Sequence, residues 1–179
     1  GARLWKGAKY AEDHGLKNVG FLRTRIEFIE SLFAPGEVSE IWITFADPQI
    51  GREKKRLTAP LFMNRYRNFL KPGGIVHLKT DSRYLHEYSI AMARQNDLKI
   101  LAYGTDIYGE DREQLYASEL SSVSGRSAID ALFEVQTFYE SQYLAQGFPI
   151  TYLAFLADHS GDYISPEWAE DLWKDEGHH

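Results

Sequence analysis

The order of apolar segments along the chain constrains its fold most, because strand-like and helix-like segments alternate. Short runs rich in β-branched and aromatic residues predict strands over residues 18–23, 40–45, 75–79, 98–103 and 150–156. Apolar residues at helical spacing between them predict helices over residues 2–14, 26–33, 58–70, 82–96 and 128–145. This alternation predicts an α/β domain with a mostly parallel sheet and helices on both faces. The last two strands bracket a long connection, so we expect an antiparallel edge strand.

The composition excludes several classes of protein. The 179 residues suggest one domain, and 44% of them are hydrophobic, which is enough for a sizeable core. No run of 18 apolar residues is present, so no transmembrane helix is predicted. The chain has no cysteine, which rules out disulfides and Cys-ligated zinc and is consistent with a cytoplasmic protein.

The charge is unevenly distributed. A net charge of −6 argues against nucleic-acid binding, yet residues 51–71 contain seven Lys or Arg residues and one Glu. A local basic patch on an acidic protein is what selective phosphate binding needs. A solvated helix face and loop would show the same pattern, so charge alone leaves both interpretations open.

Two aspartates are expected at one edge of the predicted sheet. Asp47 follows the strand at 40–45 within FADPQ, and Asp81 follows the strand at 75–79 within KTD. Ligands bind at the carboxyl ends of strands in open α/β sheets, so both carboxylates should face a crevice. The basic loop 52–58 (REKKRLT) lies between them in sequence and could hold a polyanion over the site. Each piece alone also fits an ordinary turn or loop.

Taken in order, the segments DPQ, KKRLT, FLKPGG, HLKTD, TFYE and QGFPI resemble the motifs of the bacterial tRNA guanine-N7 methyltransferases. The family pattern is FPDPW, KRRL, LKPGG, TD and TxYE, and the resemblance covers about residues 1–157. It implies a Rossmann-like class I methyltransferase fold and S-adenosylmethionine as the methyl donor. The implied acceptor is N7 of a guanine in the variable loop of tRNA.

The resemblance also implies roles for individual residues. Asp47 and Asp81 match the aspartates of the DPW and TD motifs, which makes them the candidate catalytic residues. Asp47 is expected to touch the donor as well, and Asp81 the guanine. The other candidate substrate-binding residues are Arg52, Lys54, Lys55, Arg56, Thr137 and Glu140. A donor contact is expected from Arg25 and Ile26, which stand where relatives often have Asp-Ala.

The sequence departs from the family pattern in several places. Gln49 replaces the tryptophan of DPW, Ala46 replaces the preceding proline, and the basic loop is about two residues shorter than in many relatives. No Gly-rich donor-binding loop occurs in the 179 residues. We therefore expect the natural protein to carry roughly 40–80 further residues upstream, with a strand, a Gly-rich turn and a helix. The present stretch alone is not expected to bind the donor tightly.

We divide the chain into three parts. Residues 1–157 form an N-terminally incomplete methyltransferase domain, 158–176 an acidic C-terminal segment, and 177–179 a remnant of a purification tag. Ser165, Pro166 and Glu167 have the order of a cap, a proline at the first position and an acidic first turn, which predicts a short helix to residue 176.

Two other functions fit parts of the same sequence. FADPQ is similar to the Asn/Asp-Pro-Pro-aromatic motif of amino-group methyltransferases, but Gln49 lacks the ring that would stack on the base. A non-catalytic RNA-binding subunit would fit the absence of a Gly-rich loop. An oxidoreductase is disfavoured by the same absence. The sequence does not determine the oligomeric state, and a homo-oligomer stays open.

Overall fold

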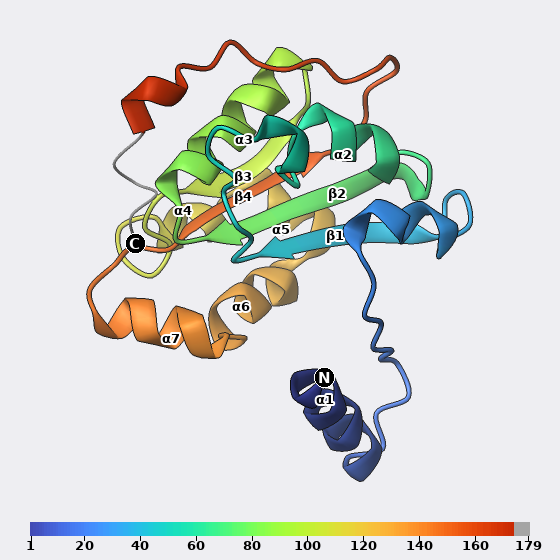
Figure 1. Cartoon of the computed structure of the whole chain (residues 1–179). Coiled ribbons are helices and arrows are strands. Elements are labelled where there is room, and N and C mark those ends of the chain that lie inside the picture. The colour runs from blue at the N-terminus through green and yellow to red at the C-terminus, as the bar shows by residue number, and fades with distance from the viewer. Residues whose placement is uncertain (174–179) are drawn as a thin grey trace. The chain divides into compact units, whose positions relative to one another are not determined.

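The computed structural model describes residues 1–173, which fall into two compact units, residues 1–34 and the residues from Pro35 onward (Figure 1). The first unit begins with α1 (Ala2–Asp13), the helix expected over residues 2–14. An extended segment leads to the 3-10 helix η1 (Ile26–Ser31), which is shorter than the helix predicted to residue 33. The ring of Phe21 lies against Gly7 of α1, where an added Cβ would meet it at 2.8 Å.

The strand predicted over residues 18–23 is wrong, because this segment has no regular structure. Its apolar side chains Val19, Phe21 and Leu22 are 44%, 45% and 61% exposed. A strand requires a neighbouring strand for its backbone hydrogen bonds, and the first unit contains no other strand among its described residues. The apolar character of the segment therefore does not make it a strand here.

The second unit is built on a mixed sheet with the strand order β1-β2-β4-β3. Its strands are β1 (Val38–Thr44), β2 (Leu70–Thr80), β3 (Ile100–Gly104) and β4 (Thr151–Leu156). β1 and β2 are parallel, and β4 is antiparallel to both β2 and β3. The final strand thus runs antiparallel as expected, but it lies inside the sheet and not at its edge. The continuous apolar run of β4, buried at five of six positions, suits a central strand.

Helices cover both faces of this sheet (Figure 1). On one face lie α2 (Pro60–Tyr66) and α3 (Arg83–Gln95). The opposite face carries α4 (Arg112–Tyr116), α5 (Glu119–Ser124) and α6 (Arg126–Glu134), whose apolar residues form one core cluster with Ile75, Tyr152 and Ala154 of the sheet. The stretch 105–126 is therefore largely helical, although its polar sequence predicts an irregular segment. The chain continues through α7 (Phe138–Ala145).

Side-chain caps fix several helix boundaries. Ser82 caps α3 as expected, since its hydroxyl accepts a hydrogen bond from the Leu85 amide at 3.1 Å. The predicted cap Thr58 instead accepts a hydrogen bond from Ser89 at 2.7 Å, so α2 begins two residues later than predicted. A helix is predicted across residues 128–145, but α7 has its own cap at Thr137 and is separate from α6.

The acidic C-terminal segment is mostly irregular. Residues 165–169 form no helix, and residues 170–173 form one 3-10 turn in place of the start of the predicted helix. The rest of that predicted helix, residues 174–176, and the expected tag remnant at 177–179 lie outside the described residues.

Two fully buried histidines lie in the sheet unit. His77 is on β2, and its ring Nδ1 is 2.6 Å from the Tyr152 hydroxyl. His86 is on α3, and neither of its ring nitrogens has a hydrogen-bond partner among the described residues. Burial lowers the pKa of each ring to about 4, and Glu40 opposes this for His77. Both side chains are therefore neutral in the folded protein near neutral pH.

These histidines predict acid instability of a defined kind. Unfolded histidine titrates near 6.5, so the unfolded state binds more protons than the folded state between pH 6.5 and 4, and stability falls as the pH falls through that window. Because His86 has no polar partner, His86→Leu should leave stability at pH 7 nearly unchanged and remove about 2 kcal/mol of the loss at pH 5.

Urea unfolding of the full-length protein at pH 7 and pH 5 measures this effect. The matched control is His14→Leu, because His14 is exposed on the first unit, and it should keep the wild-type acid profile. An identical loss of stability in wild type and His86→Leu would contradict the assignment of a neutral buried ring.

Candidate active site

The carboxyl ends of two neighbouring parallel strands bring Asp47 and Asp81 to the same edge of the sheet. Thr44, the last residue of β1, is in register with Lys79 of β2, and the Phe45 amide donates a hydrogen bond to the Lys79 carbonyl at 2.9 Å. Asp81 follows the last residue of β2 directly. Both candidate catalytic residues therefore begin at the edge where open α/β sheets bind ligands.

The loop that carries Asp47 has an uncommon backbone conformation. Phe45 and Gln49, on either side of it, have φ angles of 50° and 52°, in the left-handed region that non-glycine residues rarely adopt. The exposed Asp47 accepts a hydrogen bond from the Gln49 amide at 2.9 Å. Such strain costs on the order of 1 kcal/mol or more per residue and persists where the surroundings enforce it. The loop therefore needs an external constraint.

Arg56 provides that constraint, which differs from the phosphate-binding role expected for it. Its side chain is fully buried and donates hydrogen bonds to the carbonyls of Pro48 at 2.9 Å and Gln49 at 3.0 Å. It also donates to the Tyr84 hydroxyl and to Glu170. A guanidinium without solvent access cannot reach a nucleic-acid backbone, so Arg56 is corrected here from a substrate contact to a structural centre of the loop.

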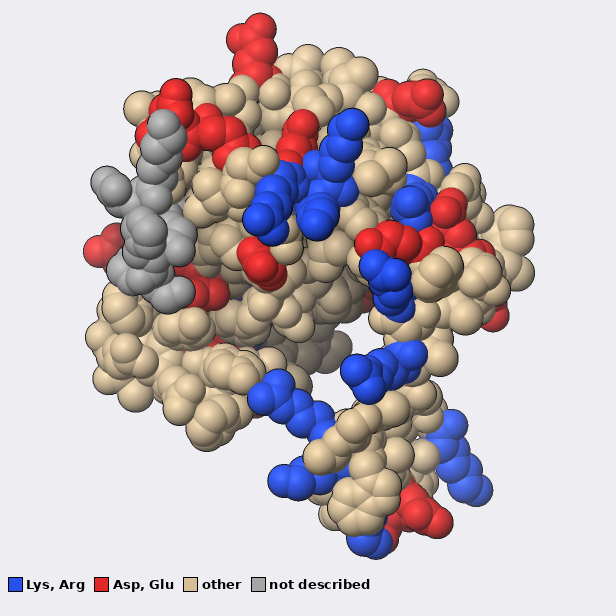
Figure 2. Space-filling view, in the orientation of Figure 1, with Lys and Arg blue, Asp and Glu red and all other residues tan. Residues whose placement is uncertain are grey.

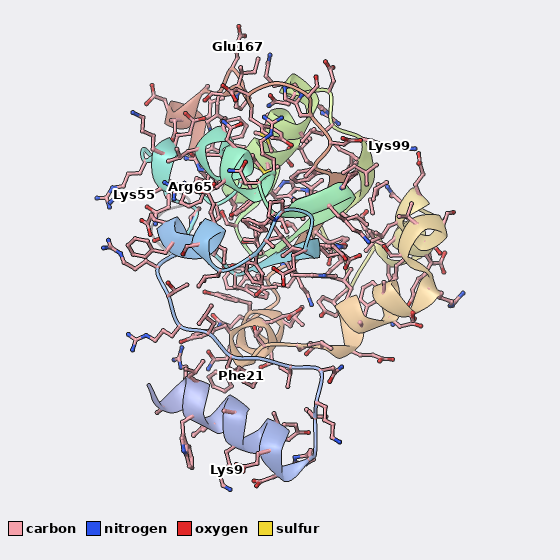
Figure 3. The ribbon with its side chains drawn as sticks, turned by 90° about the vertical axis from the view of Figure 1, so that its right-hand side faces the viewer. Lys9, Phe21, Lys55, Arg65, Lys99 and Glu167 are labelled. Carbon is pink, nitrogen blue, oxygen red and sulfur yellow. The ribbon has the colours of Figure 1, made fainter. Side chains whose placement is uncertain are left out.

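The other three cations of the loop point into solvent. Arg52, Lys54 and Lys55 are exposed, and the last two lie on the 3-10 helix η2 (Glu53–Lys55). Figure 3 shows Lys55 directed away from the body, and Figure 2 shows Lys and Arg side chains gathered on this part of the surface. Arg67 is directed elsewhere, because it donates to the carbonyl of His159 at 2.8 Å. The exposed basic surface is thus smaller than the sequence predicts and is concentrated on the loop.

The TFYE segment forms a structural unit around Glu140. Thr137 and Glu140 make a reciprocal capping box at the start of α7, with bonds of 3.1 and 3.2 Å. Glu140 is fully buried, pairs with Lys79 at 2.5 Å and accepts a hydrogen bond from Tyr108 at 2.5 Å. Lys79 also donates to the Leu132 carbonyl at 2.6 Å. Both residues were expected to contact substrate, but their polar groups are largely engaged within the chain.

A cavity of about 340 Å³ lies on the same face of the sheet as Lys79. Side chains from β1, β2 and the α6–α7 region line it: Trp42, Thr44, Phe45, Lys79, Ala131, Leu132, Val135, Thr137 and Glu140. Its size and its mostly apolar wall with a few polar groups are typical of a site for a small molecule or a base. It begins two residues before Asp47 in the chain, which links it to the strand-end carboxylates.

Sequence reasoning missed the polar residues that build this face. His77 and Lys79 alternate along β2, so both point to the face that holds the cavity. The His77 ring stacks on Trp42 with centroids 3.9 Å apart, and its Nε2 lies 3.5 Å from Glu40. Two polar residues at alternate positions of the strand IVHLK are a signal that could have identified a functional face.

The expected donor contacts Arg25 and Ile26 belong to the first compact unit. Arg25 precedes η1 in an extended conformation and is exposed, and Ile26 is the first residue of η1. They belong to a different unit from Asp47, so their role stays a proposal.

No helix among residues 1–173 is long and apolar enough to cross a membrane. Within the same residues, no group of His, Asp and Glu side chains could hold a metal ion.

Comparison with known proteins gives consistent relatives. Curated proteins called tRNA (guanine-N(7)-)-methyltransferase match from Bacteroides thetaiotaomicron (42% identity, 93% of this chain and 60% of the relative) and Christiangramia forsetii (49%, 87% and 63%). A third, from Porphyromonas gingivalis, is 39% identical over 93% of this chain and 63% of its own. The chain thus spans about 60% of the length of these relatives.

Solved structures give more distant matches. Geranyl diphosphate C-methyltransferase from Streptomyces coelicolor matches with a TM-score of 0.42 and 16% identity over 89% of this chain and 62% of its own. The [4+2]-cyclase SpnF matches with a TM-score of 0.45 and 17% identity over 89% and 64%.

A family model described as "Putative methyltransferase" matches residues 3–118, which is more than half of the chain. The matched stretch contains both strand-end aspartates and the basic loop between them. The chain therefore belongs to this methyltransferase family.

Proposed function

We propose that this chain supplies the catalytic part of a tRNA (guanine-N7-)-methyltransferase that works in the cytoplasm. The observation that carries the proposal is the placement of Asp47 and Asp81 at the ends of adjacent parallel strands, with the exposed cations of the basic loop beside Asp47. Relatives that are 39–49% identical bear this name, which supports the same activity for the protein that contains this chain.

Guanine N7 needs little chemical activation. It has an in-plane lone pair and carries no proton, so no general base is required. One displacement forms the N7–CH₃ bond and breaks the S–CH₃ bond, and the positive charge moves from sulfur to the purine. The protein must therefore align the reactants and stabilise the charge that develops on the ring.

The two aspartates suit this task. A carboxylate can accept hydrogen bonds from guanine N1–H and the 2-amino group and stabilise the cationic product. Asp47 is exposed and oriented by the Gln49 amide, while Asp81 is half-buried directly beyond β2. We assign Asp47 to the reacting centre and Asp81 to the base, with Glu140 acting through the wall of the cavity that it builds with Lys79.

The residues present fit the reactive end of S-adenosylmethionine, which supplies an electrophilic methyl group when bound. Trp42 and Phe45 line the cavity at the end of β1, and aromatic faces attract a sulfonium cation. Thr44 and Thr137 offer hydroxyls to the same cavity. For the remainder of the donor we propose Arg25 and Ile26 as contacts, as the family resemblance implies.

The basic loop would hold tRNA by its phosphates. Arg52, Lys54 and Lys55 are exposed and adjacent, so they can contact the backbone without reading the base. This arrangement explains how a protein with a net charge of −6 can bind a polyanion at one place.

The aspartates are tested by substitutions that keep their shape. Asp47→Asn and Asp81→Asn remove the charge, so each variant of the full-length protein should fold normally and lose roughly 10²-fold or more of its turnover, about 3 kcal/mol of transition-state stabilisation. Methyl transfer to unmodified tRNA measures this, with the melting temperature as a check on folding. The matched control Asp97→Asn lies beyond the end of α3 and should keep the wild-type rate. Near-normal turnover of both site variants would overturn the assignment, because Asn forms the same turns.

The loop is tested by the salt dependence of tRNA binding. Replacing Arg52, Lys54 and Lys55 by Ala should weaken binding and reduce the log–log salt slope by roughly one unit for each lost phosphate contact. Lys99→Ala is the control, since Lys99 is also exposed but projects from a different side of the sheet unit (Figure 3). A slope equal to that of the wild type would show that the loop is only a solvated surface.

A further inference from the structure

The C-terminal segment returns to the loop that carries Asp47. One carboxylate oxygen of Glu170 accepts a hydrogen bond from the Gly51 amide at 2.8 Å, and the other accepts from Arg56 Nη2 at 3.0 Å. These contacts join positions 119 and 114 residues apart in the chain. A single side chain from the tail therefore touches both the backbone of the loop and the buried cation beneath it.

Arg56 passes this contact on to the residues next to Asp47. Its guanidinium is bonded to the carbonyls of Pro48 and Gln49, the two residues that directly follow Asp47. It also lies over the rings of Tyr84 and Tyr88 on α3, at 4.8 and 4.1 Å from their centroids. Since the planar fork is held on both faces and at its donors, a change at Glu170 is transmitted to the backbone around Asp47.

The tail is anchored on the same helix. The Trp168 ring packs edge-on against Tyr84 and Tyr88, each at 5.6 Å between centroids. Further upstream, Asn96 exchanges two hydrogen bonds with the backbone of Ile164, at 2.8 and 2.9 Å. The segment from 164 to 170 is therefore fixed to α3 independently of Glu170, and Glu170 is presented to the loop from a rigid support.

Glu170 also keeps its charge in this position. Partial burial opposes ionisation, but hydrogen bonds from Tyr84, the Gly51 amide and Arg56 outweigh it and lower the pKa of the carboxyl. The charge balances a guanidinium that is removed from water. An amide at the same position could offer one acceptor where the loop requires two.

We propose that Glu170 is a positioning residue that holds, through Arg56, the strained loop presenting Asp47, so that the C-terminal segment is part of the catalytic machinery. The inference rests on the proposed function, because Asp47 is assigned there to the reacting centre. It adds a requirement that the strand-end motifs do not contain: a carboxylate far downstream in the chain.

The first test compares two glutamates of the same tail in the full-length protein. Glu170→Gln should lower kcat for tRNA methylation by about 10-fold or more, because a displaced catalytic group loses alignment, while KM for tRNA changes by less than about twofold. Glu167→Gln is the matched control, because Glu167 is exposed and projects away from the body (Figure 3) and should keep the wild-type rate. A normal kcat for Glu170→Gln would overturn the proposal.

A double substitution separates positioning from a general loss of stability. If Glu170 acts by placing Asp47, adding Glu170→Gln to Asp47→Asn should cost less than about twofold further, since the group to be positioned is already absent. Multiplicative losses in the two variants would contradict the proposal and indicate independent effects.

Limited trypsin digestion tests the loop without any activity. Glu170→Gln should speed cleavage after Arg52, Lys54 and Lys55 relative to both wild type and Glu167→Gln, because the loop opens more often. Unchanged cleavage would overturn the clamp itself. If the wild-type protein proved inactive on tRNA but digestion showed the expected change, the proposed function would fail while the clamp between tail and loop would stand.

Discussion

The candidate site depends on one buried guanidinium. Arg56 fixes the carbonyls of Pro48 and Gln49 from beneath, and this allows the backbone on both sides of Asp47 to remain in the left-handed region. A buried cation is unfavourable unless it is fully paired, so the aromatic rings of α3 and the tail carboxylate are required together. The same arrangement leaves the neighbouring cations Lys54 and Lys55 free for a phosphate backbone.

The opposite wall of the site rests on a second buried pair. Lys79 and Glu140 join the end of β2 to the start of α7, and the cavity lies beside them. The TxYE pattern is therefore also a capping box, which holds α7 at the site whether or not its side chains touch substrate. A motif shared by a family can have its origin in the construction of the wall as much as in contact with the ligand.

The sequence predicts the parts of this site that local pattern determines. The ends of β1 and β2 follow from the lengths of two apolar runs, and this suffices to place Asp47 and Asp81 at one edge. The burial of Arg56 could not be read from REKKR, because four of its five residues are cations and the choice among them is made by Tyr84, Tyr88 and Glu170, far away in the chain. The interior place of β4 and the irregular segment at 18–23 were missed for a related reason, since strand pairing is decided by partners and not by the strand's own residues.

The most direct test of the account is the identity of the methylated nucleoside. Unmodified tRNA would be incubated with S-adenosylmethionine and the full-length protein, digested, and analysed by mass spectrometry against standards of each methylguanosine. The account predicts 7-methylguanosine in the variable loop, because the site offers carboxylates for charge stabilisation and needs no base for proton removal. A methyl group on an exocyclic amine, or no methylation by a folded full-length protein, would contradict it.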